Sequence, residues 1–222
     1  MVLIKIDEDK NNKRVNYLLK YKNKYVLFYT LKVNPIIITP ECIEKGLKED
    51  CNSCNISCLS PRSFCIKPYK NHKKGCPNYG LKEGCPPNVP MFDKVYDINK
   101  PIYLGINEYN LIEHERKMKE KHPEWTKEAL RNSRHYQPIM EAINFRAVKE
   151  WIKDYPDLVV TNYIESMGID LVKTLKNHNI ELLFGDKMDI TRRIILMGSL
   201  LETAKDNIEL KENVKILKFK NK

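Results

Sequence analysis

The stretch LVVTNYIESMGIDLVKTLKNHNI, residues 158–180, decides the fold class of this chain of 222 residues. Its opening part, Leu158–Tyr163, is apolar and β-branched, which is typical of a strand. Ile164–His178 follows as a predicted helix. Its inward face is expected to carry Met167, Leu171, Val172 and Leu175. A strand that leads directly into a helix is the repeating unit of α/β proteins, so the stretch predicts that class.

The segments on the C-terminal side continue this alternation. Ile180–Phe184 predicts a strand, and Val214–Phe219 predicts another at the end of the chain. Between them, Asp189 is expected to cap a helix. The apolar residues of that helix are Ile194, Ile195, Leu200 and Leu201. The sequence therefore predicts an α/β fold in which helices pack on a mixed sheet, with an irregular cysteine-rich segment added to it.

The segments on the N-terminal side supply further strands and helices. The β-rich runs Val15–Tyr21 and Tyr25–Lys32 predict a hairpin, and Pro101–Ile106 predicts a strand. Three helices are predicted after that strand, over Leu111–Lys121, Pro123–Arg131 and Pro138–Lys153. In the last of these helices, one face is expected to carry Ile139, Ala142, Ile143, Ala147 and Trp151.

The composition is that of a folded, basic protein. Hydrophobic residues make up 42% and charged residues 31%, and the net charge is +10 with a pI near 9.1. No apolar run approaches the roughly 20 residues that span a bilayer, and charged residues come too early for a secretory signal. We therefore expect a cytoplasmic protein without a membrane partner. The excess of lysine makes nucleic acid a possible partner.

All seven cysteines lie in the N-terminal part of the chain. They are Cys42, Cys51, Cys54, Cys58, Cys65, Cys76 and Cys85. Hydrophobic periodicity disappears between Asp50 and Pro90, where metal ligation would replace the missing burial of apolar side chains. The sequence thus predicts a β-rich part over 1–49, a metal-binding segment over 50–90 and an α/β part over 91–222, all in one compact unit.

The spacing of the cysteines favours an iron–sulfur cluster, of the 4Fe-4S type, over zinc. Only one C-x2-C pair is present, His72 has no second histidine at a finger-like distance, and both Cys76 and Cys85 precede proline. Zinc is the alternative. The candidate ligands are Cys51, Cys54, Cys58, Cys65, Cys76 and Cys85, and spacing alone leaves open which of them bind and whether they form one centre or two. Cys42, on a predicted short helix that begins at Thr39-Pro40, is expected not to bind.

Three segments resemble those of a known family. Cys76-Pro77-Asn78-Tyr79-Gly80 with Cys85-Pro86-Pro87 resembles the "CPxxG…CPP" signature of a domain-of-unknown-function family of predicted metal-binding proteins. The range Glu165–Leu175 resembles the "EAxGIDVxxT" segment of that family. Cys51-x2-Cys54-x3-Cys58, followed by Cys65, is similar to its second cysteine cluster, although here this cluster precedes CPP. The resemblance implies an iron–sulfur protein and implies no particular reaction.

Two residues outside the cysteine segment are candidates for substrate binding. Glu165 is predicted at a strand-to-helix junction, where it would bind a substrate amine, act as a base, or only stabilise the helix N-terminus. Arg131 begins the polar stretch Arg131–Gln137, which would clasp an anion or stack a base, or serve only as a solvated connector. The histidines His114, His122 and His178 are expected at the surface.

Basic residues accompany the cysteines. Lys67, Lys70, His72, Lys73 and Lys74 surround Tyr69, and they would contact phosphate groups or balance the negative charge of a cluster. The leading hypothesis is an iron–sulfur protein with redox or sulfur-handling chemistry on a small-molecule substrate or RNA. A zinc-stabilised nucleic-acid-binding module and an electron-transfer or metal-carrier protein that serves another redox protein are the alternatives.

Overall fold

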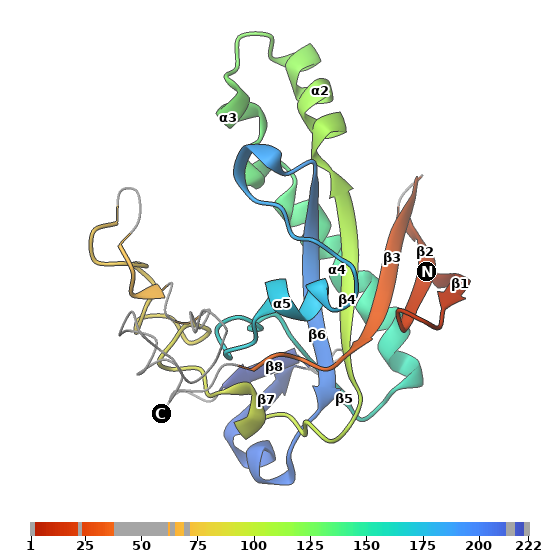
Figure 1. Cartoon of the computed structure of the whole chain (residues 1–222), viewed down its shortest axis with the longest axis vertical. Coiled ribbons are helices and arrows are strands. Elements are labelled where there is room, and N and C mark those ends of the chain that lie inside the picture. The colour runs from red at the N-terminus through yellow and green to blue at the C-terminus, as the bar shows by residue number, and fades with distance from the viewer. Residues whose placement is uncertain are drawn as a thin grey trace. The chain divides into compact units, whose positions relative to one another are not determined.

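The computed structural model describes residues 3–21, 24–37, 62, 65–68, 72–211 and 216–219 (Figure 1). Contacts divide the chain into two units that alternate along the sequence. Unit 1 comprises Met1–Lys32, Tyr103–Pro156 and Asn179–Ile195. Unit 2 comprises Val33–Ile102, Asp157–His178 and Leu196–Lys222. Strands and helices occur in both units, so the described part of the chain is a mixed α/β structure, as the sequence predicts.

The sheet of unit 1 has the strand order β1-β2-β3-β4-β6. Its strands are β1 (Leu3–Asp9), β2 (Arg14–Tyr21), β3 (Lys24–Val33), β4 (Ile102–Asn110) and the first part of β6 (Ile190–Ser199). The antiparallel pairing of β2 with β3 confirms the predicted hairpin, and β4 confirms the strand predicted from Pro101. The edge strand β1 was not predicted, because its exposed face breaks the apolar pattern.

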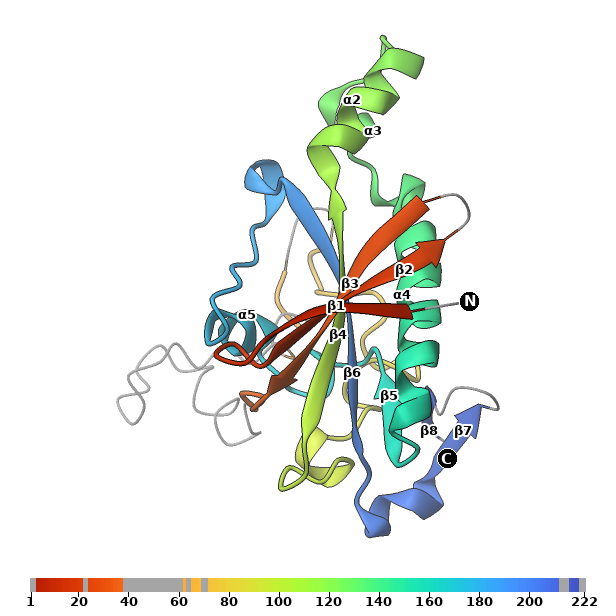
Figure 2. The same ribbon diagram turned by 90° about the vertical axis from the view of Figure 1, so that its right-hand side faces the viewer.

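Helix α4 (Gln137–Trp151) lies along one face of this sheet (Figure 2). Asn144, buried within the helix, donates through Nδ2 to the carbonyl oxygen of Arg193 on β6 at 2.9 Å. Trp151 donates through Nε1 to the hydroxyl of Tyr17 on β2 at 3.0 Å. Ile143, Ala147 and Trp151 are buried as predicted, but Ile139 is 47% exposed and that prediction was wrong. The next residue, Met140, is buried instead of Ile139.

Helices α2 (Leu111–Lys121) and α3 (Lys127–Leu130) follow β4. Asn110 caps α2, because its side-chain oxygen accepts the N–H of Glu113 at 2.8 Å. The predicted bounds of α2 are confirmed. The helix predicted over Pro123–Arg131 is shorter than expected, since Thr126 acts as the N-cap and its hydroxyl accepts the N–H of Ala129.

The sheet of unit 2 includes the last residues of β6 and has the strand order β6-β5-β8-β7. Its other strands are β5 (Leu158–Thr161), β7 (Ile208–Lys211) and β8 (Ile216–Phe219). β5 pairs antiparallel with β6 and parallel with β8, while β7 pairs antiparallel with β8. The strands predicted at Leu158 and at the end of the chain are confirmed, and β7 was missed.

Two predictions on the C-terminal side were wrong. Ile190–Ser199 forms strand β6 where a helix capped by Asp189 was expected, and Ile180–Phe184 is not a strand. The central position of β6 explains the error. Its residues Ile195–Ser199 are buried, and a continuous apolar run of this kind is equally compatible with a buried helix.

Helix α5 (Leu171–Lys176) is also shorter than the predicted range Ile164–His178. Gly168 has a φ of +88°, which no residue inside an α-helix adopts, and Asp170 then caps α5 by accepting the N–H of Lys173 at 3.0 Å. Met167, Leu171 and Leu175 are buried as predicted. Val172 is 41% exposed, contrary to the prediction.

Short 3-10 helices complete the described elements: η2 (Phe92–Lys94), η3 (Ser133–His135), η4 (Ile152–Asp154), η5 (Gly185–Lys187) and η6 (Glu202–Asn207). Within the described ranges, no helix combines the length and the apolar character needed to cross a membrane.

Candidate metal centre in the cysteine segment

Three of the candidate ligands, Cys65, Cys76 and Cys85, lie in the described part of unit 2. All three are half-buried, and none forms a disulfide. They are carried by a run of turns, because the described residues between 65 and 91 form neither an α-helix nor a β-strand. The other sequence candidates, Cys51, Cys54 and Cys58, lie outside the described residues, as does Cys42 with its predicted short helix.

Backbone contacts bring Cys65 and Cys76 together. The N–H of Cys76 donates to the carbonyl oxygen of Cys65 at 2.7 Å. Gly75 makes this approach possible: its φ is +84°, and a Cβ at that position would lie only 2.6 Å from the same carbonyl oxygen. Glycine is the residue that tolerates both conditions. A glycine directly before Cys76 is therefore a steric requirement of the turn.

Cys85 lies on a second closed turn. The N–H of Gly80 donates to the carbonyl oxygen of Pro86 at 2.8 Å, so the chain closes on itself around Cys85. The N–H of Cys85 donates to the Lys82 carbonyl, and the Cys85 carbonyl accepts from Asn88 at 3.0 Å. The Cys76–Gly80 and Cys85–Pro87 parts of the family-like signature thus correspond to two hydrogen-bonded turns, one around each cysteine.

The cysteine turns pack on the loop that precedes α5. A Cβ on Gly84 would lie 2.3 Å from ring carbon Cε1 of Tyr163, so the backbone at Gly84 lies directly on that ring. The N–H of Phe92 donates to the carbonyl oxygen of Met167 at 2.9 Å. Sequence reasoning did not single out Tyr163, because the residue it packs on is a glycine far away in the chain.

Arg62 joins two parts of the cysteine-rich segment by contacts with residues that follow Cys85. Its Nη2 donates to the carbonyl oxygen of Val89 at 2.9 Å, and its Nη1 contacts Sδ of Met91 at 2.8 Å. Sequence reasoning missed this role as well. A main-chain acceptor and a thioether leave no recognisable signal in the sequence.

The electrostatics link the three cysteines to Glu165. Burial raises the pKa of the Cys65 thiol, and the neighbouring thiols of Cys76 and Cys85 and the carboxylate of Glu165 raise it further. The guanidinium of Arg62 acts in the opposite direction. The predicted substrate residue Glu165 therefore lies within electrostatic range of a predicted ligand, although the two are far apart in sequence.

Glu165 itself has an altered acidity. Partial loss of hydration raises the pKa of its carboxyl group, and the nearby Asp170 carboxylate adds to the effect. The residue is exposed to solvent, so the loss of hydration is incomplete. A carboxyl group of raised pKa that remains accessible keeps its proton to a higher pH than an ordinary carboxyl group, which suits it to exchange a proton with a bound molecule.

The donor set fits sulfur ligation but is incomplete within the described residues. Thiolates are the ligands of iron–sulfur clusters and of many structural zinc sites. Among the residues that the structure describes, no group of three His, Cys, Asp or Glu side chains is arranged to hold a metal ion. The described thiols are thus part of a donor set that Cys51, Cys54 or Cys58 would complete.

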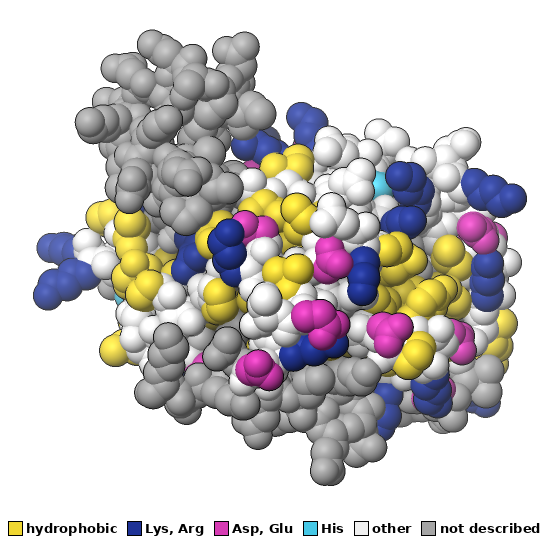
Figure 3. Space-filling view, turned by 90° about the horizontal axis from the view of Figure 1, so that it is seen from below, with side chains coloured by type: hydrophobic (Ala, Val, Ile, Leu, Met, Phe, Trp, Pro, Cys, Tyr) yellow, Lys and Arg dark blue, Asp and Glu magenta, His cyan; other side chains and the backbone are white. Residues whose placement is uncertain are grey.

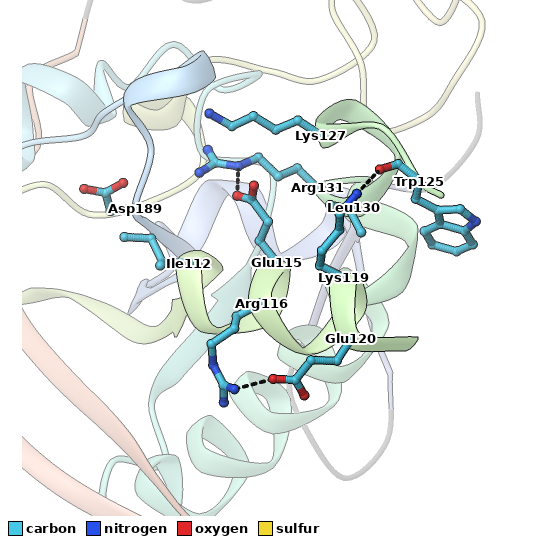
Figure 4. A pocket seen from close by; sticks show the side chains of 10 residues that line it. All are labelled: Ile112, Glu115, Arg116, Lys119, Glu120, Trp125, Lys127, Leu130, Arg131 and Asp189. Atoms are coloured by element: carbon cyan, nitrogen blue, oxygen red, sulfur yellow. Dashed lines mark hydrogen bonds and ion pairs between the residues drawn. The ribbon is translucent and has the colours of Figure 1, made fainter. Parts of the chain in front are cut away.

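The second predicted substrate residue, Arg131, lines a pocket of about 860 Å³ in unit 1 (Figure 4). Its Nε donates to Oε2 of Glu115 at 2.6 Å, and its Nη1 donates to the carbonyl oxygen of Met188 at 3.2 Å. The guanidinium therefore braces α2 against the chain that precedes β6. Anion binding by Arg131 remains a prediction, and an incoming anion would compete with the Glu115 carboxylate.

His114 on α2 is buried, so its predicted surface position was wrong. Its Nδ1 lies 2.9 Å from the hydroxyl of Tyr109, and its ring meets Tyr136 edge to face. The aromatic residues around it form a small apolar cluster with Leu111 and Met140. His122 and His178 are half-buried.

Comparison of the chain with protein-family models, with curated proteins and with solved structures finds no match. The family resemblance carried by the cysteine motifs and by Glu165–Leu175 therefore remains a prediction.

Proposed function

We propose that this chain binds an iron–sulfur cluster through Cys65, Cys76 and Cys85, together with one or more of Cys51, Cys54 and Cys58. The observation that carries the proposal is that three unpaired, half-buried thiols lie on turns held by main-chain hydrogen bonds, with Cys76 and Cys85 both within electrostatic range of Cys65. Unpaired thiols gathered in this way are typical of a ligand set, because structural disulfides would require paired sulfurs.

The surroundings of the thiols favour a cluster over zinc. Cys76 and Cys85 both sit in Cys-Pro turns, and an iron–sulfur cluster tolerates the irregular spacing between them. A zinc-stabilised binding module is the second candidate, because a set of thiols alone also fits a structural zinc site.

A bound cluster would supply one-electron chemistry. Glu165 is the residue of this chain best situated to handle a proton beside it, since its carboxyl pKa is raised and its charge acts on Cys65. The proposed activity is therefore redox chemistry on a small molecule, or electron transfer to another redox protein, at the surface formed by the cysteine turns and the loop before α5.

Anaerobic purification with metal analysis tests the proposal. We expect a brown protein that contains iron and acid-labile sulfide and absorbs at about 400 nm, as thiolate-bound clusters do. The variants Cys65→Ser, Cys76→Ser and Cys85→Ser should lose iron, whereas the control Cys42→Ser should keep it. A colourless protein with stoichiometric zinc would overturn the cluster in favour of the zinc-stabilised module. Retention of iron by all three ligand variants would refute the ligand assignment.

A further inference from the structure

The turns that carry the cysteines also carry exposed cations. Lys73, Lys74 and Lys82 are exposed, and none of them forms an ion pair with another residue in the described part of the chain. Glu83 is the only acidic residue of the described chain between Cys65 and Asn88, and it is half-buried. The local surface is therefore positively charged.

Apolar side chains lie among these lysines. Leu81 is 81% exposed, and Ile66 and Tyr79 are exposed to a smaller extent. A leucine this exposed gains little stability from burial in the fold, whereas at a protein interface it would lose contact with water. Figure 3 shows, from below, hydrophobic side chains beside lysine and arginine side chains at the left edge of the molecule.

Main-chain contacts place these residues on adjoining turns. The main chain at Gly75 touches Ile66, because a Cβ at Gly75 would lie 3.0 Å from the Cα of Ile66. Lys73 and Lys74 immediately precede Gly75. The N–H of Tyr79 donates to the Cys76 carbonyl, which places Tyr79, Leu81 and Lys82 on the following turn. We call this surface the cysteine-loop face, and its members are Ile66, Lys73, Lys74, Tyr79, Leu81 and Lys82.

We propose that the cysteine-loop face is the docking surface for a small acidic electron-carrier protein. The inference rests on the proposed function, since it places the carrier beside the cluster ligands. Unpaired lysines attract a negatively charged partner and speed its encounter, and exposed aliphatic side chains hold it at short range. A nucleic acid would use the same lysines, but its phosphate backbone would gain little from Leu81 and Ile66.

The transfer step is simple. A reduced carrier, such as a ferredoxin, would give up one electron and be oxidised, and a cluster held by the cysteines of this chain would accept that electron and be reduced. No covalent bond forms or breaks. Because Cys65, Cys76 and Cys85 are half-buried, they would hold a cluster near the surface, where the distance that the electron must cross is short.

Binding of an acidic ferredoxin to the purified full-length protein, measured calorimetrically at low and high salt, tests the proposal. We expect Lys73→Glu with Lys74→Glu to weaken binding by about tenfold at low salt, with the difference fading as salt screens the charges. Leu81→Ser should weaken binding about threefold or more, with little dependence on salt. The control pair Lys20→Glu with Lys149→Glu carries the same charge change on exposed residues of unit 1 and should bind like the wild type.

The outcomes separate this inference from the proposed function. Iron content is measured on every variant. If the protein lacks a cluster but still binds ferredoxin through these lysines, the result contradicts the proposed function and leaves the docking surface intact. An iron-loaded protein that does not bind ferredoxin at low salt overturns the docking surface. Equal weakening by the control pair also overturns it. Binding of a single-stranded RNA through the same lysines, without ferredoxin binding, would replace the acidic carrier with nucleic acid as the partner.

Discussion

The main-chain N–H of Cys76 donates to the carbonyl oxygen of Cys65 at 2.7 Å, so the backbone itself joins two candidate ligands. The hydrogen bond holds the two turns together without involving either thiol. A ligand pair positioned in this way loses less conformational entropy on metal binding than two cysteines in a free loop. The residue that allows the contact is Gly75, and the first prediction concerns it.

Replacement of Gly75 by alanine should disrupt the candidate site. The left-handed backbone alone disfavours alanine by about 1–2 kcal/mol, and the new Cβ would clash with the Cys65 carbonyl. We expect lower stability in urea unfolding together with loss of bound metal. The matched control is Gly185→Ala, because Gly185 also has a positive φ, of +65°, but no atom lies within 4 Å of its Cβ position. Equal metal content in both variants would contradict the role given to Gly75.

The hydroxyl of buried Tyr29 is expected to contribute measurably to stability. It donates to Oε1 of Glu108 at 3.0 Å, and the same oxygen accepts from Nε of Arg192 at 2.8 Å. Tyr29→Phe removes one donor from this buried group and should lower the free energy of unfolding by about 1–2 kcal/mol. Tyr25→Phe is the control, since Tyr25 is 59% exposed and its change should stay within about 0.5 kcal/mol.

His114 should make the protein less stable in mild acid. Burial lowers the pKa of its imidazole in the folded state, and the nearby His135 and Lys117 lower it further, while the Leu130 carbonyl partly opposes this. The unfolded chain, with a histidine pKa of about 6.5, then binds the proton more readily than the folded chain. Stability is therefore full above the unfolded pKa and falls as the pH drops below it.

Urea unfolding at about pH 8 and about pH 5 measures this effect. The loss of stability between the two pH values should be smaller in His114→Gln than in the wild type, because the variant cannot take up that proton. His178→Gln, outside the cluster around His114, should keep the wild-type loss. An unchanged loss in His114→Gln would show that other groups cause the acid sensitivity.

Asp170 is expected to stabilise the short helix α5. Its side-chain oxygen accepts the N–H of Lys173 at 3.0 Å, and its own N–H donates to the Ile36 carbonyl. Asp170→Ala removes the cap and should cost about 1 kcal/mol, measured by chemical unfolding. Asp170→Asn keeps the capping oxygen and should cost only a few tenths of that, because the ion pair with Lys173 is long, at 3.4 Å, and contributes little. Equal losses in the two variants would exclude the cap as the cause.

The sequence by itself determined the features that depend on local pattern. Hairpin β2–β3, strand β4 and helices α2 and α4 follow from alternation, helical spacing and capping residues, all of which act within a few positions of the chain. The concentration of cysteines in a segment without apolar periodicity likewise identified the candidate site. The length of α5 was predicted too long because local pattern alone does not exclude a glycine inside a helix. Only the structure shows that Gly168 has a φ of +88°, so that the helix begins only at Leu171.

Only the tertiary structure decided the features that depend on distant partners. β6 is a strand because β5 pairs with it, and its buried apolar run would have suited a helix equally well. His114 is buried because Tyr109 and Tyr136 surround it, and Tyr163 meets the cysteine turns because Gly84 has no side chain. Pairing and burial between distant segments set these positions, and no local pattern of residues records them.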